Sequence, residues 1–162
     1  MLSIEGSRYS LMEIDNYGFL LPGREVIHIG LRETIVRAAD TSGGIIGHVP
    51  VQLAQLPLYV PSGRLGLLDY LPEERRFAAC LSSGAKEVAI ACDAIRPFTP
   101  SANHLRQPLP TVQAVRNSPL KELLLDEQRL YFVTDTLALF AYLSTQPIDI
   151  YEPESTSLVA EG

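Results

Sequence analysis

Short apolar runs separated by polar turns recur along most of the chain, which is the pattern of β-strands rather than of long helices. The first two runs cover residues 8–14 and 17–21, and Asp15 and Asn16 lie between them. Asp and Asn tolerate the left-handed backbone that a tight hairpin requires. The pattern therefore predicts a β-hairpin near the N-terminus.

The clearest hairpin comprises residues 77–81 and 88–92, joined by a short loop that contains glycine. If Ser83 pairs with Lys86 across the loop, Cys80 faces Ala89 and Cys92 faces Phe77. The two sulfurs are then not cross-strand partners. We therefore expect two buried, reduced thiols, which are typical of a cytoplasmic protein.

The stretch between these hairpins contains three prolines, at positions 50, 57 and 61, among Val, Leu and Ile. Prolines at that spacing exclude a helix and suit short edge strands or bulges. Residues 31–39 are ambiguous, because their apolar spacing fits a helix but the segment is short.

A strand at residues 130–133 is followed by the one clear helical pattern of the chain. Thr134 or Asp135 is placed to cap this helix, which runs through Leu143. Its predicted apolar side carries Leu137, Leu139, Phe140 and Leu143. The sequence thus predicts a mainly β domain over residues 1–146, with a C-terminal helix and an acidic, frayed tail over residues 147–162.

Charge and composition restrict the classes of partner. The formal charge is −6, with 13 Lys and Arg against 19 Asp and Glu and no cluster of bases, so we expect neither nucleic acid nor an anionic membrane as partner. No stretch approaches the roughly 18 consecutive apolar residues of a membrane helix. Because the N-terminus lacks the features of a signal peptide, we expect a cytoplasmic location.

Motifs for metal, nucleotide or nucleophilic chemistry are absent from the sequence. The histidines, His28, His48 and His104, have no metal-ligand spacing, and we expect His28 to end a strand and the other two to lie in loops. The glycines at 43–47 lack the Lys-Ser/Thr of a phosphate loop. We therefore expect no cofactor, no metal and no enzymatic activity.

Asp93 is the one carboxylate in a suggestive position, directly after the apolar run 88–92. As a general base it has no histidine or second acid near it in sequence. As a structural residue it would accept hydrogen bonds from backbone N–H groups at the strand end, near Ala94 and Ile95. We favour the structural role, and an enzyme that uses Asp93 with a histidine stays an alternative.

The order of three segments resembles one protein family. Residues 17–27 (YGFLLPGREVI) are similar to an early strand and turn of the form Y-x-hydrophobic-P-x-x-V-x-E-V. Residues 76–95 are similar to a central hairpin that ends in V-D-x-V, and residues 125–137 to a closing strand and helix. Together they resemble the CheW-like family, the adaptor module of bacterial chemosensory arrays.

The resemblance implies a fold of two SH3-like, five-stranded β-barrel lobes with a C-terminal helix. It also implies a non-enzymatic adaptor or scaffold that couples a chemosensory histidine kinase to receptors in chemotaxis or pilus-type signalling. One barrel would bind the kinase, and the groove between barrels would receive a chemoreceptor helix. The expected partner-binding residues are Arg24, Glu25, Val26, Ile46 and Gly47.

One segment departs from the family pattern. The family carries a Gly-x-x-Asn-Leu-Arg-Gly run, whereas residues 48–52 after Gly47 read HVPVQ, without the Asn or the Arg. An arginine forms directional, charge-assisted hydrogen bonds that Val and Gln cannot replace. We therefore expect kinase-type binding to be retained more than receptor binding. A small-molecule-binding β-barrel, which a deep closed pocket would favour, is the remaining alternative.

Overall fold

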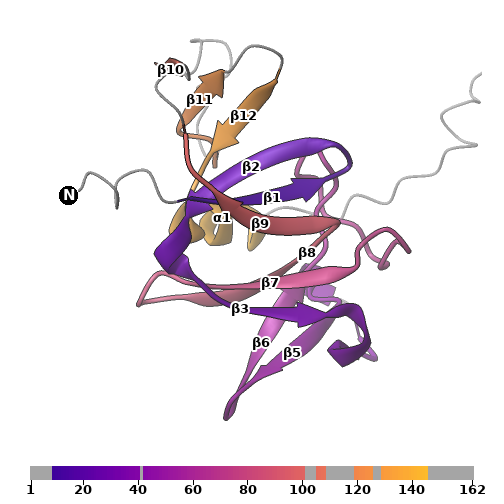
Figure 1. Cartoon of the computed structure of the whole chain (residues 1–162). Helices are drawn as coiled ribbons and strands as arrows, with labels where there is room; N and C mark the ends of the chain where they lie inside the picture. Colours follow the sequence, from indigo (N-terminus) through magenta and orange to yellow (C-terminus); the bar gives the residue numbers. More distant parts are fainter. Residues whose placement is uncertain (1–8, 41, 101–104, 109–118, 126–128, 146–162) are drawn as a thin grey trace, which may run out of the picture.

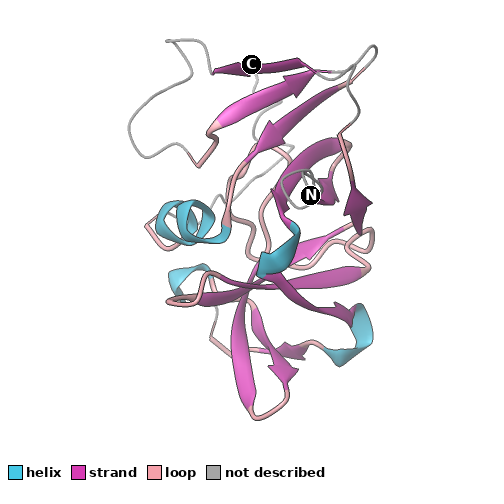
Figure 2. Cartoon of the chain, turned by 60° about the vertical axis from the view of Figure 1, so that its left-hand side comes forward, coloured by secondary structure: helices cyan, strands magenta, loops and turns pink. Residues whose placement is uncertain are grey.

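The computed structural model describes residues 9–40, 42–100, 105–108, 119–125 and 129–145, and these form two β-sheets and one α-helix (Figures 1 and 2). The first sheet has the strand order β10-β11-β12-β2-β1-β9. Its strands are β1 (Tyr9–Ile14), β2 (Tyr17–Pro22), β9 (Ala94–Phe98), β10 (Leu105–Pro108), β11 (Glu122–Leu125) and β12 (Leu130–Val133).

The second sheet comes from the middle of the chain and has the order β3-β7-β8-β6-β5-β4. Its strands are β3 (Val26–Leu31), β4 (Val36–Arg37), β5 (Gly47–Val51), β6 (Ala54–Tyr59), β7 (Phe77–Ser82) and β8 (Glu87–Cys92). A Cβ atom placed on Gly30 of β3 would lie 3.3 Å from Cγ1 of Val49 on β5. The missing side chain lets these strands meet, so the sheet curls like a barrel.

The predicted fold class, mainly β with two barrel-like lobes and a C-terminal helix, is confirmed. Each sheet has six strands within the described residues, one more than expected. In the second sheet, one of the six strands, β4, has only two residues. The proposed tail, residues 147–162, lies outside the described residues.

Both predicted hairpins are present, and the central one has the predicted register. Asp15 and Asn16 have φ angles of 52° and 71°, the left-handed conformation expected of the first turn. In the central hairpin Cys80 is paired with Ala89, and both cysteines are free and buried. Burial raises the pKa of Cys80 to about 11 and that of Cys92 to about 12, so both thiols stay protonated at neutral pH.

The helix α1 (Thr136–Leu143) begins at the predicted cap. The carboxylate of Asp135 accepts a hydrogen bond from the backbone N–H of Ala138 at 2.8 Å. Leu139 and Leu143 are buried, but Leu137 is 53% exposed, so its predicted place on the apolar side is wrong. Leu139 and Leu143 are one turn apart on the same face, whereas Leu137 lies on the opposite side of the helix.

Two further sequence-based predictions need correction. His28 lies within β3 rather than at its end, and His48 lies in β5 rather than in a loop, while His104 is outside the described residues. Residues 31–39 form a 3-10 turn, Arg32–Thr34, and the short β4, so the helical spacing there does not produce an α-helix.

The two sheets and the helix share one apolar core. Met12 and Leu21 come from the first sheet, Leu81 and Ile90 from the second, and Leu139 from α1. Further apolar residues pack inside each lobe. Among the described residues, no helix has the length and apolar character needed to cross a membrane.

Candidate functional site

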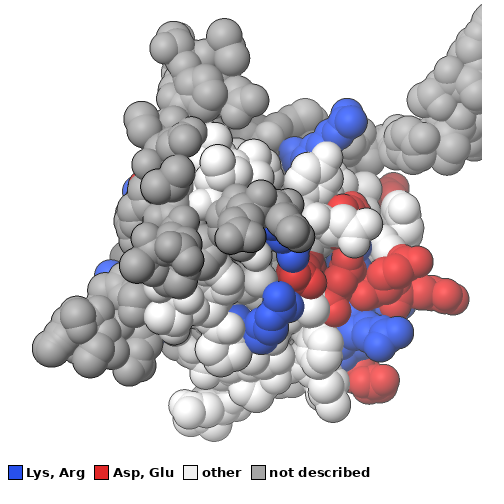
Figure 3. Space-filling view, turned by 45° about the horizontal axis from the view of Figure 1, so that its top comes forward, with Lys and Arg blue, Asp and Glu red and all other residues white. Residues whose placement is uncertain are grey.

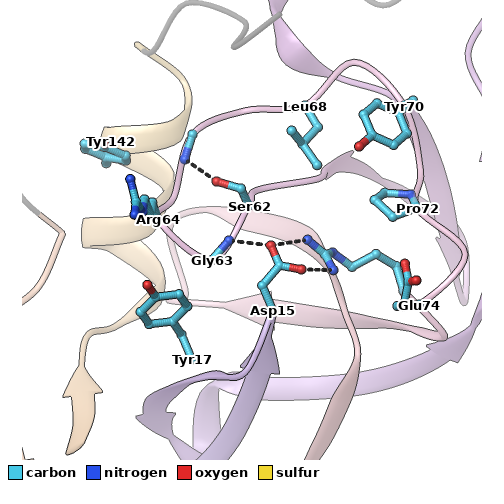
Figure 4. A pocket seen from close by; sticks show the side chains of 12 residues that line it. Asp15, Tyr17, Ser62, Gly63, Arg64, Leu68, Tyr70, Pro72, Glu74 and Tyr142 are labelled. Atoms are coloured by element: carbon cyan, nitrogen blue, oxygen red, sulfur yellow. Dashed lines mark hydrogen bonds and ion pairs between the residues drawn. The ribbon is translucent and has the colours of Figure 1, made fainter. Parts of the chain in front are cut away.

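A cavity of about 590 Å³ lies where the connection between β6 and β7 meets the β1–β2 turn and α1 (Figure 4). Asp15 and Tyr17 contribute from the β1–β2 hairpin, and Tyr142 contributes from the helix. The β6–β7 connection supplies the other lining residues, which are Ser62, Gly63, Arg64, Gly66, Leu68, Tyr70, Pro72, Glu74 and Arg75. Segments of both lobes therefore form this site.

Arg75 is the structural centre of the site, with a side chain that is only 1% exposed. Its Nη1 donates to Asp15 Oδ1 at 2.9 Å and to Asp93 Oδ1 at 2.8 Å, and its Nη2 donates to the carbonyl of Pro61 at 3.1 Å. Asp15 follows β1 and Asp93 follows β8. The guanidinium thus joins the β6–β7 connection to the ends of strands in both sheets.

The partners of Asp93 differ in part from those expected. Its Oδ2 accepts a hydrogen bond from the backbone N–H of Asp15 at 2.8 Å, and its Oδ1 accepts from Arg75. The prediction of a carboxylate that accepts backbone N–H bonds is right in kind. The donor lies 78 positions away rather than at Ala94 or Ile95, because the turn of one sheet packs against the strand end of the other.

The charges of this cluster stabilise each other. Burial alone would raise the pKa of Asp15, but hydrogen bonds from Arg75 and Gly63 outweigh it and hold that pKa below its ordinary value. Burial alone would lower the pKa of Arg75, and the two carboxylates outweigh it in the same way. Asp15 and Arg75 are therefore both charged at neutral pH.

A second arginine holds the segment that carries Arg75. The guanidinium of Arg32, at the end of β3, donates hydrogen bonds to the carbonyls of Leu71, Pro72 and Arg75. Three backbone acceptors on one rigid donor group restrict the backbone conformation of residues 71–75. Arg75 therefore enters the cluster from a fixed backbone.

The opposite wall is a tight loop, residues 62–66. The N–H of Gly63 donates to Asp15 Oδ2 at 2.8 Å, and the N–H of Gly66 donates to Ser62 Oγ at 3.2 Å. A Cβ on Gly63 would lie 2.4 Å from Cδ2 of Tyr17, so only glycine fits there. Leu65 has a φ of 67°, which is unusual for a bulky residue.

The expected partner-binding residues form two separate groups. Arg24 and Glu25 lie in the 3-10 turn before β3, and Val26 is the first residue of β3. Ile46 is 2% exposed and Gly47 is buried in β5, so neither offers a side chain to a partner. The first group thus lies at the surface around the start of β3, whereas the second is buried at the start of β5.

Besides its expected role in partner binding, Glu25 forms a hydrogen bond within the protein. Its Oε1 accepts a hydrogen bond from the backbone N–H of Thr136, at the start of α1. Partner binding by Arg24, Glu25 and Val26 stays a prediction.

The residues that follow this group form an exposed apolar surface that sequence reasoning missed. Ile27, Ile29 and Leu31 are 45%, 44% and 55% exposed, and we call them the β3 patch. β3 is an edge strand of its sheet within the described residues. Apolar residues in a strand normally indicate its buried face, so the sequence carried no signal that these three are exposed.

Arg75 and Asp15 were also missed as site residues. Each lies in a polar stretch that reads as an ordinary turn or charged loop. Arg75 and Asp15 are 60 positions apart, and Arg75 and Asp93 are 18 apart, so no short motif connects them. Only the packing of the two sheets brings the three side chains together.

The described residues contain no candidate metal centre, and the face drawn in Figure 3 carries charges of both signs. Within the described residues no group of three or more His, Cys, Asp and Glu side chains is placed to hold a metal ion. On the face drawn in Figure 3, acidic and basic side chains are intermixed beside a wide uncharged area.

The sequence matches no family model and no curated protein. The structure, in contrast, is similar to that of the scaffolding protein TtCheW from Thermoanaerobacter tengcongensis, with a TM-score of 0.66. The match covers 83% of this chain and 87% of the other, at 12% sequence identity. The chain has the CheW fold. At this identity the likeness establishes the fold alone.

Proposed function

We propose that this protein is a CheW-like adaptor that binds a chemosensory histidine kinase through the β3 patch and the neighbouring residues Arg24, Glu25 and Val26. It acts by binding and does not catalyse a reaction. The fold of a scaffolding protein supports this assignment, and so does the order of motifs that resembles the family. The protein would act in the cytoplasm, where the signalling domains of such kinases lie.

The β3 patch is the observation that carries the proposal. Single exposed apolar residues are ordinary on protein surfaces, but here three large ones occupy one edge strand. Fully burying one such side chain contributes about 1.5–3 kcal/mol, so a partner that covered all three would gain substantial binding energy. Arg24 beside them supplies the charged rim that interfaces typically have.

The composition of the β5–β6 turn is one reason to expect weak binding to a chemoreceptor. Its residues Val51, Gln52, Leu53 and Ala54 are uncharged, and Leu53 is fully exposed. The family's Asn-Leu-Arg-Gly run would place an arginine in this region. Without that arginine, we propose that binding to a kinase is retained and that binding to a chemoreceptor helix is weakened.

The structure bears differently on the two alternatives, an enzyme that uses Asp93 and a small-molecule-binding β-barrel. Both carboxylate oxygens of Asp93 accept hydrogen bonds from Arg75 and Asp15, and no described histidine contacts it, so the arrangement does not favour an enzyme. The cavity beside Arg75 is open to solvent rather than deep and closed. It does, however, favour a ligand role that can coexist with the adaptor function.

The direct test is calorimetric titration of the purified protein with the CheW-like regulatory domain of a chemosensory kinase from the same genome. We expect binding by the wild type and at least tenfold weaker binding by Leu31→Asp, because a buried carboxylate has no partner in an apolar interface. Leu137→Asp is the matched control, since Leu137 is 53% exposed on α1, outside the patch. Absence of wild-type binding, or equal loss in both variants, contradicts the proposal.

A further inference from the structure

The cavity beside Arg75 has a charged group without a partner at each of two ends. Arg64 and Glu74 are both exposed, and within the described residues neither forms a hydrogen bond or an ion pair. In Figure 4, Arg64 lies near Tyr142 and Tyr17, and Glu74 lies on the other side of the Asp15–Arg75 pair. A ligand in the cavity would therefore meet a positive end and a negative end.

The charges between these ends are already satisfied. Asp15 accepts hydrogen bonds from Arg75 and from the N–H of Gly63, and Arg75 also pairs with Asp93. Arg75 (+1) with its two carboxylate partners (−2) has a net charge of −1, so the guanidinium has no unpaired positive charge to offer a ligand. Arg64 is thus the unpaired positive charge of the described lining, and the net negative charge of the cluster adds to that of Glu74 at the other end.

The surface between the two ends suits apolar or aromatic groups. Tyr17, Tyr70 and Tyr142 contribute rings, and Leu68 and Pro72 contribute aliphatic surface. The volume of about 590 Å³ falls within the roughly 300–1,000 Å³ of small-ligand sites, which often form where two lobes meet.

The loop that presents Arg64 is rigid and strained. The N–H of Leu65 donates to the carbonyl of Ser62 at 2.8 Å, and the N–H of Ser62 donates to the carbonyl of Gly66 at 2.7 Å. Leu65, next to Arg64, has the left-handed φ of 67° that bulky residues rarely adopt. Strain of this kind is concentrated at ligand-binding sites, because the surrounding structure must maintain it.

We propose that this cavity binds a short zwitterionic peptide with apolar side chains. Its carboxylate would pair with the Arg64 guanidinium, a strong and directional interaction. Its ammonium group would pair with the Glu74 carboxylate. A purely anionic ligand would be repelled at Glu74 and a purely cationic one at Arg64, so a ligand with both charges fits best.

This site is independent of kinase binding, because no residue of the β3 patch lines the cavity. The probe is the tripeptide Leu-Phe-Leu, used with free ends, with an acetylated N-terminus and with an amidated C-terminus. Binding to the full chain is measured by calorimetry and by NMR shifts of the Gly63 and Gly66 amides. We expect the zwitterion to bind and each blocked form to bind at least tenfold more weakly.

Two variants connect each end of the peptide to its protein partner. Arg64→Gln should weaken binding of the free tripeptide at least tenfold and leave binding of the amidated form unchanged. Glu74→Gln should likewise weaken binding of the free tripeptide at least tenfold, and it should leave binding of the acetylated form unchanged. The matched controls are Arg37→Gln and Glu73→Gln, which change exposed charges outside the cavity. Neither control should alter the affinity.

All four variants should unfold at the wild-type temperature, because none removes an intramolecular bond that the described residues form. Absence of tripeptide binding at millimolar concentration overturns the proposal. Binding that depends on only one of the two charges, or on neither, overturns it as well, since the zwitterion requires both.

Discussion

At the residue scale, Arg75 shows how a charged side chain can become part of the interior. It is almost completely buried, yet two carboxylates and a backbone carbonyl accept hydrogen bonds from it. Burying a guanidinium without such partners would be very costly. The two aspartates remain partly exposed, so solvent moderates the strength of each ion pair.

Replacing Asp93 with Ala should destabilise the protein by about 1–3 kcal/mol, because the Asp15 N–H and one Arg75 donor lose their acceptor. Urea unfolding at pH 7 measures the change. Asp93→Asn keeps an acceptor and removes the charge, so it should cost less. Unchanged stability of the Ala variant would show that Asp93 has no structural role.

Acid should weaken the contribution of Asp15. Its pKa in the folded protein is lower than the ordinary value of 3.8, so the unfolded state binds a proton first as the pH falls. The stabilisation is complete above that ordinary value and is lost as the pH falls through the folded-state pKa. Urea unfolding of the wild type and of Asp15→Asn, compared between pH 7 and pH 3, should show the difference shrinking only below about pH 4. A difference that stays constant throughout would contradict this assignment.

At the scale of single elements, α1 depends on polar contacts at its first turn. Asp135 accepts the N–H of Ala138, and Glu25, from the turn before β3, accepts the N–H of Thr136. Four N–H groups at a helix start lack partners inside the helix, and these two carboxylates satisfy two of them. Through Glu25, the helix is also connected to the start of the second sheet.

Asp135→Ala should cost about 1 kcal/mol of stability, because it removes the cap of the helix. Asp135→Asn, which can still cap, should retain most of that stability. Thermal unfolding followed by far-ultraviolet circular dichroism compares the two. Equal melting temperatures for Ala and Asn would indicate that the cap contributes nothing.

At the scale of the whole molecule, the two lobes are joined through shared packing. Their sheets contribute side chains to one apolar core, and the Arg75 cluster connects the ends of β1 and β8. Neither sheet can open without exposing part of that shared core. Separate domains, in contrast, would unfold in separate steps.

Calorimetric unfolding of the protein should therefore show one transition, with a calorimetric enthalpy equal to the van't Hoff enthalpy. Arg75→Met should lower the melting temperature and leave the single transition intact, because the shared core persists. Two resolved transitions in the wild type would mean that the lobes unfold independently.

Local features of the fold could be predicted from the sequence because neighbouring residues determine them. Asp15 and Asn16 favour a left-handed turn, the loop after β7 sets the pairing of Cys80 with Ala89, and Asp135 caps α1. The mainly β class followed from the short apolar runs, whereas the barrel-like lobes were expected from the resemblance to the CheW-like family. The error at Leu137 arose where the apolar character of a residue did not reveal which way it faces.

Tertiary structure alone decided the candidate sites. Asp15, Arg75 and Asp93 meet because two sheets pack together, and no spacing along the chain encodes that meeting. Burial of Ile46 and exposure of the β3 patch likewise depend on which neighbours cover each face. The alternation of apolar and polar residues determines that a strand forms. Whether the apolar side chains of that strand face the core or a partner depends on its position in the sheet, at the edge or in the centre.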